Sequence, residues 1–256
     1  MRNVKVVVQY DGTDYFGFQF QPGVPTIQRE LEKVLSTIIK ERVGIYGSGR
    51  TDTGVHAAGQ VISFRTNGTI PIEKLCIAMN SLLPDSIAAI EACEVESDFH
   101  ARYSAKSRLY VYDILNREVP NALESRFSWH IRHPLDVRAM DESAGALLGV
   151  HDFSSFACAD RDEGSPMRDL QEIRVERAGE HVLLTMRANA FLRSMARIIV
   201  GTLVEVGLGM RPGSDVQRIL DAADRRLAGK TAPAHGLCLV EVEYDRDAGL
   251  HSASRA

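Results

Sequence analysis

One order of secondary-structure elements, strand-helix-strand-strand-helix-strand, is predicted twice along this sequence, and it limits the possible folds more than any other feature. In the first half, hydrophobic residues alternate over residues 4–10, and a helical face runs over 27–39 with Thr26 as its N-cap. Strands are predicted over residues 43–46, 60–66 and 87–95, and Pro71 opens a second helix between the last two of them.

The second half repeats this order with one extra helix. Strands are predicted over residues 108–115, 170–177, 181–188 and 237–244, with a hairpin turn at Gly179 and Glu180. Helices are predicted over 137–148 and 191–206, and a third follows a capping box from Ser214 to Gln217. The split βαβ order is the ferredoxin-like topology. We therefore predict an α+β fold of two ferredoxin-like halves, with joined antiparallel sheets and a central cleft. The polar connector at 99–106 separates domains 1–104 and 105–256.

Composition excludes several classes of protein. The chain has 256 residues, of which 45% are hydrophobic and 25% charged, as in soluble globular proteins. No run approaches the ~20 apolar residues of a membrane span, and the N-terminus enters a predicted strand directly, so we expect no signal peptide and a cytoplasmic protein. The four cysteines are scattered, which favours buried thiols in a reducing compartment over zinc ligands or disulfides. The net charge of −4 means that any nucleic acid must bind where positive charge is gathered in one groove.

The segment 47–56, Gly-Ser-Gly-Arg-Thr-Asp-Thr-Gly-Val-His, is the strongest candidate for chemistry. Its three glycines are expected to adopt backbone conformations that other residues resist. Such a loop can hold Asp52 at a fixed angle with Arg50 nearby, and a carboxylate beside a guanidinium stays ionised, as a nucleophile or general base must. The alternative is that Asp52 only stabilises its own turn, and spacing alone favours that interpretation.

Cationic and aromatic residues in the second half also admit two interpretations. Arg193 and Arg197 lie four residues apart on the apolar predicted helix, where they either reach the surface or, for Arg197, pair with an anion in the cleft. Tyr110 and Tyr112 lie on the same face of a predicted strand. They either pack within the sheet, as strand tyrosines commonly do, or provide a flat ring that stacks on a base. The cations before this strand belong either to a solvated connector or to a phosphate-binding surface: Arg102, Lys106 and Arg108.

Six segments then indicate a family. They are residues 10–13 with 17–19, 49–57, 108–112, 151–156, 191–201 and 231–237. In these segments, and from end to end, the sequence resembles the TruA family of tRNA pseudouridine synthases. It departs from the family at Phe18, where many relatives have tryptophan, and at Ala196, where many have valine; both changes are typical of packing variation.

The resemblance implies a reaction and the residues that perform it. Such enzymes isomerise uridine to pseudouridine at positions 38 to 40 of the tRNA anticodon stem-loop, without metal or cofactor, as homodimers. By resemblance Asp52 is the catalytic aspartate, which attacks C1′, attacks C6 or takes a proton from C2′. Arg50 displaces the target nucleotide, Tyr110 stacks on the uracil and acts as acid or base, and Arg197 pairs with the aspartate. Arg193 stands where relatives often carry tyrosine.

Two other classes of function are weighed against this one. A non-catalytic RNA-binding protein built from ferredoxin-like halves normally shows the aromatic signature of RRM domains, which we do not find in this sequence. A carboxylate hydrolase acting on a nucleoside or glycoside needs two acidic groups. Asp52 has no acidic neighbour within its loop, so Asp11 or Asp14 has to approach it in space.

Overall fold

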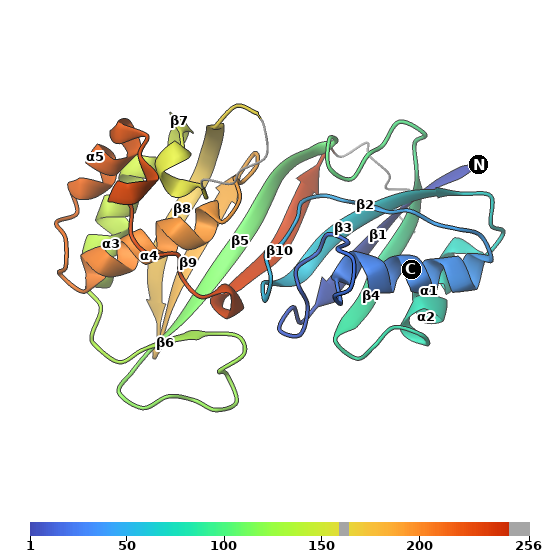
Figure 1. Ribbon diagram of the computed structural model, residues 1–256, viewed down its shortest axis with the longest axis horizontal. Helices are drawn as coiled ribbons and strands as arrows, with labels where there is room; N and C mark the ends of the chain where they lie inside the picture. The colour runs from blue at the N-terminus through green and yellow to red at the C-terminus, as the bar shows by residue number, and fades with distance from the viewer. Residues whose placement is uncertain (159–163, 246–256) are drawn as a thin grey trace, which may run out of the picture. The chain divides into compact units, whose positions relative to one another are not determined.

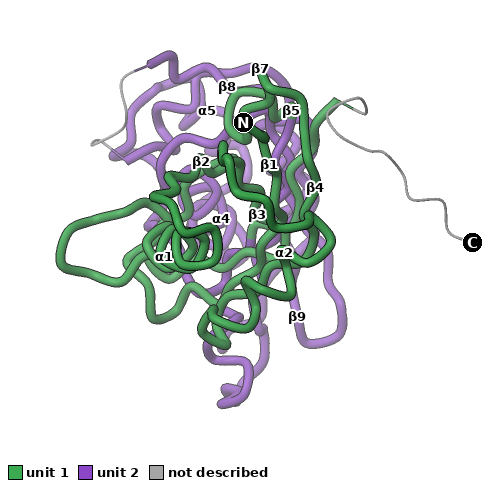
Figure 2. Tube along the Cα trace, turned by 90° about the vertical axis from the view of Figure 1, so that its right-hand side faces the viewer, with its two compact units in different colours: residues 1–106, 239–256 green, residues 107–238 purple. Residues whose placement is uncertain are grey.

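The computed structural model describes residues 1–158 and 164–245, and the chain divides into two compact units. The first unit contains residues 1–106 and those from 239 onward, and the second contains residues 107–238 (Figure 2). Both units are mixed α+β with mostly antiparallel strands. The division after Lys106 falls close to the predicted boundary at 104. The last strand, however, groups with the first unit, whereas the sequence placed it in the second domain; the domain limits themselves stay a prediction.

In the first unit two helices pack together beside an antiparallel sheet (Figure 1). The strand order is β4-β1-β3-β10, with the short β2 paired to β3. Strand β1 is antiparallel to both neighbours, with Val6 opposite Ile62 of β3 and Ala92 of β4. Strand β10 lies beside β3. The elements are β1 (Arg2–Tyr10), α1 (Ile27–Ile39), β2 (Tyr46–Gly47), β3 (His56–Thr66), α2 (Ile72–Asn80), β4 (Ile87–Val95) and β10 (Leu237–Tyr244).

Helix α1 confirms the predicted amphipathic pattern. Thr26 caps it, because its hydroxyl accepts a hydrogen bond from the Arg29 backbone amide at 3.4 Å. The helix ends at Lys40, whose φ of 61° is left-handed. Its buried face carries Ile27, Leu31 and Leu35, and β1 buries its alternating valines, so the core of the unit is formed by the residue patterns seen in the sequence.

In the second unit the strand order is β5-β9-β8-β7, with β6 parallel to β5. The predicted hairpin is confirmed, since Gly179 has a φ of 64° and Ala178 pairs with His181. Helix α3 packs on β8 and on α4 (Figure 1). The elements are β5 (Ala105–Asn116), β6 (Trp129–Ile131), α3 (Val137–Ala144), β7 (Gly149–Asp152), β8 (Met167–Ala178), β9 (His181–Ala188), α4 (Met195–Gly207) and α5 (Asp215–Ala222).

Several local predictions are wrong. Helix α4 begins at Met195 rather than at residue 191, because Ser194 has a left-handed φ of 59° that cannot continue a helix. Ser214 is already helical and its side chain caps nothing, so the predicted capping box is absent. Strand β5 begins three residues earlier than predicted, and β6 and β7 were not predicted. The four cysteines are free thiols of intermediate burial rather than fully buried.

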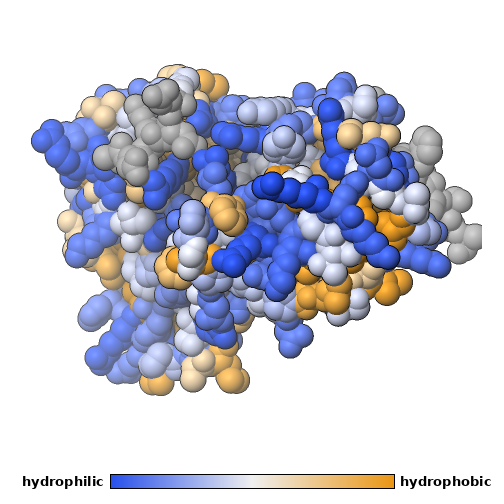
Figure 3. Space-filling model, turned by 45° about the vertical axis from the view of Figure 1, so that its right-hand side comes forward, coloured by the Kyte–Doolittle hydropathy of each residue, from blue (hydrophilic) through white to orange (hydrophobic). Residues whose placement is uncertain are grey.

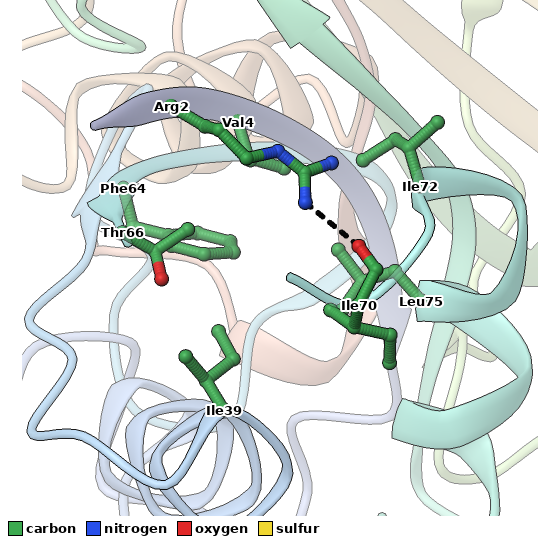
Figure 4. Close-up of a pocket in the computed structure, with 8 residues that line it drawn as sticks. All are labelled: Arg2, Val4, Ile39, Phe64, Thr66, Ile70, Ile72 and Leu75. Atoms are coloured by element: carbon green, nitrogen blue, oxygen red, sulfur yellow. Dashed lines mark hydrogen bonds between the residues drawn. The ribbon is translucent and has the colours of Figure 1, made fainter. Parts of the chain in front are cut away.

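A small hollow lies under β1 in the first unit (Figure 4). Arg2 donates a hydrogen bond from Nη1 to the Ile70 carbonyl oxygen at 2.7 Å at this position. The hollow measures about 10 Å³, room for about one water molecule, so it cannot hold a nucleotide.

The outer surface carries mixed polar and apolar side chains. The face drawn in Figure 3 is mostly hydrophilic, with separate hydrophobic areas between the polar side chains. None of the helices in the described part of the chain is long and apolar enough to cross a membrane.

Candidate active site

The predicted catalytic loop joins β2 to β3 in the first unit. Its first residues are tied to β3, since the Ser48 amide donates to the Val61 carbonyl oxygen at 2.8 Å. A turn follows Asp52, whose carbonyl oxygen accepts from the Val55 amide at 3.1 Å, and Gly54 within that turn has a φ of 78°. Asp52 is half-buried and Arg50 is exposed. The backbone on both sides of Asp52 is thus fixed, as the sequence predicted.

A buried glutamine holds the loop from below. Gln60 on β3 has no exposed surface, and its Oε1 accepts from the Ser48 hydroxyl at 2.6 Å while its Nε2 donates to the Gly49 carbonyl oxygen at 3.0 Å. Next to it, the hydroxyls of Tyr10 and Thr51 are 2.9 Å apart. Sequence patterns did not predict the role of Gln60. A signal was present, because Gln60 directly precedes Val61 and Ile62 in the predicted strand 60–66, and a buried amide requires polar partners.

The loop over residues 11–18 clamps the catalytic loop from another side. Its Phe18 amide donates to the Thr51 carbonyl oxygen at 3.1 Å. A Cβ added to Gly12 would collide with the Val55 carbonyl, and one added to Gly17 would lie 2.8 Å from the Thr51 carbonyl oxygen. The two backbones therefore touch directly, which only glycine permits at these two positions.

The three glycines of the catalytic loop differ in their roles. Gly54 alone has a positive φ. Gly47 has an ordinary conformation, but a Cβ there would lie 2.6 Å from the Phe18 ring, so it is needed for space. Gly49 meets neither constraint. The prediction that all three relieve backbone strain is therefore right only for Gly54.

Asp11 and His56 meet at the base of the clamp. The Nδ1 atom of His56 accepts from the Gly12 amide at 3.0 Å, and Asp11 Oδ1 lies 3.2 Å from the same atom. Because Nδ1 accepts the hydrogen bond from Gly12, it does not donate one to Asp11 in this arrangement. Asp11 also accepts from the Thr13 amide at 3.0 Å. These partners show Asp11 in a structural role.

Arg197 and Arg193 occupy different environments in the second unit. Arg197 lies half-buried on α4, where its Nε donates to the Ala232 carbonyl oxygen at 2.8 Å and its own carbonyl oxygen accepts from the Ala232 amide at 3.0 Å. A Cβ on Gly201 would collide with the Lys230 carbonyl, so the segment around Ala232 lies directly on the helix. Arg193 is exposed and precedes the helix. The predicted spacing of four residues on one helix is therefore wrong for this pair.

The two tyrosines of β5 are both buried. Tyr110 is 7% exposed and packs edge-on against Phe191, with ring centroids 4.9 Å apart. Tyr112 is fully buried and donates from its hydroxyl to the Pro233 carbonyl oxygen at 2.8 Å. Burial is the main cause that raises the pKa of Tyr112 far above its usual value, so this hydroxyl stays protonated. Tyr112 therefore supports the packing of the unit, and Tyr110 remains the candidate for base contact.

The three cations proposed for phosphate binding lie in different settings. Arg102 is exposed. Lys106 lies on β5 rather than before it, and its Nζ is 2.9 Å from an Asp245 carboxylate oxygen. Arg108 is only 8% exposed and donates from Nη1 to the Asn189 carbonyl oxygen at 2.6 Å, so any phosphate contact must use its other N–H groups.

The candidate site residues thus form three local clusters, one in the first unit and two in the second. Asp52 and Arg50 share the clamped loop of the first unit. Tyr110 with Phe191, and Arg197 with Ala232, form two supported positions in the second. Within residues 1–158 and 164–245 no cluster of three or more His, Cys, Asp or Glu side chains could hold a metal ion. A fixed carboxylate, a cation and a buried phenol are groups that act in acid-base and nucleophilic chemistry.

Comparison with known proteins agrees with these motifs. A family model described as tRNA pseudouridine synthase matches residues 6–104 and 144–245. Proteins named tRNA pseudouridine synthase A are similar over nearly the whole chain. The one from Halalkalibacterium halodurans is 46% identical, covering 93% of this chain and 90% of its own. The one from Thermoanaerobacter sp. is 45% identical, covering 95% and 100%. The one from Moorella thermoacetica is 47% identical, covering 94% and 99%.

A solved structure is also similar, but weakly. A chain of the crystal structure of a Cbf5-Nop10-Gar1 complex is 14% identical with a TM-score of 0.33, over 78% of this chain and 45% of that chain, too low a score to support a conclusion on fold. The family model and the relatives that match nearly the whole chain do identify the family. This chain belongs to the tRNA pseudouridine synthase family.

Proposed function

We propose that this chain isomerises uridine to pseudouridine in the anticodon stem-loop of tRNA, at positions 38 to 40, with Asp52 as the catalytic carboxylate. The isomerisation follows from family membership. The observation that carries the site is the catalytic loop, in which buried hydrogen bonds and a second loop fix the backbone on either side of Asp52.

The proposed reaction uses a carboxylate and consumes no co-reactant. The N1–C1′ bond of the uridine breaks, the uracil turns, and a C5–C1′ bond forms. C5 loses its proton to water and N1 takes one up, so the product is an isomer and no electrons or groups are supplied. Asp52 begins the reaction by attacking C1′, by attacking C6 or by taking the C2′ proton. All three routes require the ionised form, and the proposed role of Arg197 is to pair with it and keep it ionised.

The target base must leave the helical stem before it can react. Extruding a base costs a few kcal/mol, and stacking on an aromatic ring returns roughly 1–3 kcal/mol. Arg50, exposed on the same loop as Asp52, is proposed to take the place of the extruded nucleotide. Tyr110 is proposed to stack on the uracil. Phosphate contacts are proposed for Arg102, Lys106, Arg108 and Arg193.

The proposal extends to the assembly and the architecture. We propose that two copies form a homodimer in the cytoplasm, so that one tRNA touches both. The finer fold of two ferredoxin-like halves, with joined sheets and a central cleft, belongs to the same proposal. Sedimentation equilibrium of the purified protein tests the dimer: a single species of monomer mass at micromolar concentration would contradict it.

Release of tritium from tRNA labelled at uridine C5 tests the reaction. In the presence of EDTA, the unsubstituted protein is expected to release tritium to water and to leave the RNA chain whole. Asp52→Asn is expected to lower the rate about a thousandfold or more while tRNA binding persists.

The same assay distinguishes the alternatives. A non-catalytic RNA-binding protein would release no tritium, and a hydrolase would liberate free uracil. Full tritium release by Asp52→Asn would show that another group performs the chemistry.

A further inference from the structure

Three aromatic rings on the first unit form a contiguous array that has no assigned role. We call Tyr46, His100 and Tyr103 the aromatic array. The His100 ring centroid lies 4.5 Å from that of Tyr46 and 4.5 Å from that of Tyr103, with interplanar angles of 39° and 40°. Tyr46 is 58% exposed and Tyr103 is 77% exposed. His100 is half-buried between them, and two exposed aromatic rings in one cluster are typical of an interaction site.

The array stands on a rigid base. Tyr46 lies on β2 opposite Ser63 of β3, and the Ser63 hydroxyl accepts from the Ala101 amide at 3.0 Å. The Ala101 carbonyl oxygen in turn accepts from the Tyr244 hydroxyl at 2.7 Å. Ala101, which lies between His100 and Tyr103 in the chain, is therefore held from both β3 and β10.

The turn is also fixed at its ends. The Asn3 side-chain amide donates to the Phe99 carbonyl oxygen at 2.9 Å, and the Phe99 ring is buried against Tyr244. The Ser104 amide donates to the His100 carbonyl oxygen at 2.9 Å. Because these bonds order the backbone in advance, a ligand that binds the rings loses little additional conformational freedom of the protein.

Two cations flank the rings. The guanidinium carbon of Arg102 lies 5.7 Å from the Tyr103 ring centroid, and the exposed Arg65 donates to the Ser97 carbonyl oxygen at 2.7 Å. Partial burial, with the positive charges of Arg102 and Arg65, lowers the pKa of His100 against an opposing backbone hydrogen bond. The imidazole is thus neutral at neutral pH while positive charge lies beside it.

We propose that the aromatic array is a stacking platform for unpaired bases of the RNA substrate, with Arg65 and Arg102 at the adjoining phosphates. Flat exposed rings combined with cations match the alternation of bases and phosphates in single-stranded RNA. A duplex offers phosphates but no free base faces, so it does not satisfy both requirements. The proposal rests on the RNA substrate of the proposed function, and it does not depend on the assignment of Asp52.

Ring-removing and ring-keeping substitutions test the platform. Tyr103→Leu and Tyr46→Leu keep an apolar side chain but lose the aromatic face, whereas Tyr103→Phe and Tyr46→Phe keep the face. Fluorescence anisotropy with an unmodified tRNA transcript and with an oligo-uridine strand is expected to show a Kd raised about tenfold for each leucine variant. The phenylalanine variants are expected to bind within about twofold of the unsubstituted protein. Phe127→Leu, which alters a 49% exposed ring of the second unit, is the matched control and is expected to bind normally.

Further measurements distinguish the ways in which the platform proposal could be wrong. A blunt RNA duplex is expected to bind all these variants equally, and single-turnover tritium release at saturating tRNA is expected to stay within about twofold. Equal oligo-uridine binding by the leucine and phenylalanine variants would overturn the platform. Dissociation of a dimer by Tyr103→Leu, measured by sedimentation, would overturn it too, because the array would then contact a second copy of the chain. Loss of tritium release by Asp52→Asn with normal oligo-uridine binding would support the chemistry alone, so the two proposals can fail separately.

Discussion

At the scale of single residues, the Arg197 side chain is held in place by the backbone of Ala232. Its Nε donates to the Ala232 carbonyl oxygen, which fixes how the guanidinium is rotated. Arg197→Lys retains a charge but loses this bond and the planar fork. We expect kcat to fall at least tenfold while the Kd for tRNA changes less than about threefold. Single-turnover tritium release and filter binding measure the two quantities; a defect in binding alone would contradict the proposed pairing with Asp52.

His100 provides a pH-dependent contribution to stability at the same scale. Its pKa is lowered in the folded protein, so the unfolded chain takes up a proton first as the pH falls. Its contribution is therefore full above the unfolded pKa of about 6.5 and is lost as the pH falls from there toward the folded value. His100→Phe keeps a ring that does not titrate. The difference in Tm between about pH 8 and about pH 5 is expected to be smaller in this variant, and an equal difference would show that His100 contributes nothing.

At the scale of elements, Gln60 couples β3 to the catalytic loop. Gln60→Leu fills similar space but leaves the Ser48 hydroxyl and the Gly49 carbonyl oxygen without this partner. Each unsatisfied buried group costs about 1–3 kcal/mol, so for two groups we expect the free energy of unfolding to fall by roughly 2–6 kcal/mol. We also expect kcat to fall, since Asp52 loses its support.

A second amide serves as the control for Gln60. Asn80 binds the Ala89 amide at 2.7 Å and the Ala89 carbonyl oxygen at 2.9 Å, outside the catalytic loop. Asn80→Ala is expected to lower the free energy of unfolding and to leave kcat unchanged at a temperature where both variants are folded. Urea unfolding and tritium release measure the two effects. Equal kcat for Gln60→Leu and the unsubstituted protein would show that β3 does not position the loop.

Sequence patterns predicted the long elements and missed features that depend on few residues or on distant partners. The buried face of α1 and its Thr26 cap are local, so periodicity predicted both. The start of α4 depends on the left-handed Ser194, for which serine gives no clear signal. Strands β6 and β7 are too short to show a period. The loop of Asp52 was recognised from its motif, whereas the sequence alone does not show that Gln60 binds Ser48 and Gly49 of that loop, 12 and 11 residues earlier.

At the scale of the whole molecule, a chain of net charge −4 must bind a polyanion through local positive charge. Arg102→Gln and Lys106→Gln are each expected to lower the slope of log Kd against log salt concentration by about 0.7 to 0.9. Asp245→Asn removes the carboxylate beside Lys106 and is expected to tighten binding slightly. Titrations of tRNA at several salt concentrations measure these slopes, and unchanged slopes would exclude both cations from phosphate contact.

The position of β10 has a consequence for how the protein is made. This strand lies beside β3 of the first unit, although among the described residues it is the last strand to be synthesised. During synthesis, the part of the β3 edge that β2 does not pair stays uncovered while residues 107–238 are translated, and uncovered edges pair with foreign strands. The turn that carries His100 and Tyr103 also lacks its hydrogen bond from the Tyr244 hydroxyl until that residue has been synthesised. Nascent chains stalled before residue 237 should therefore depend on chaperones, and synthesis and emergence of β10 should end that dependence.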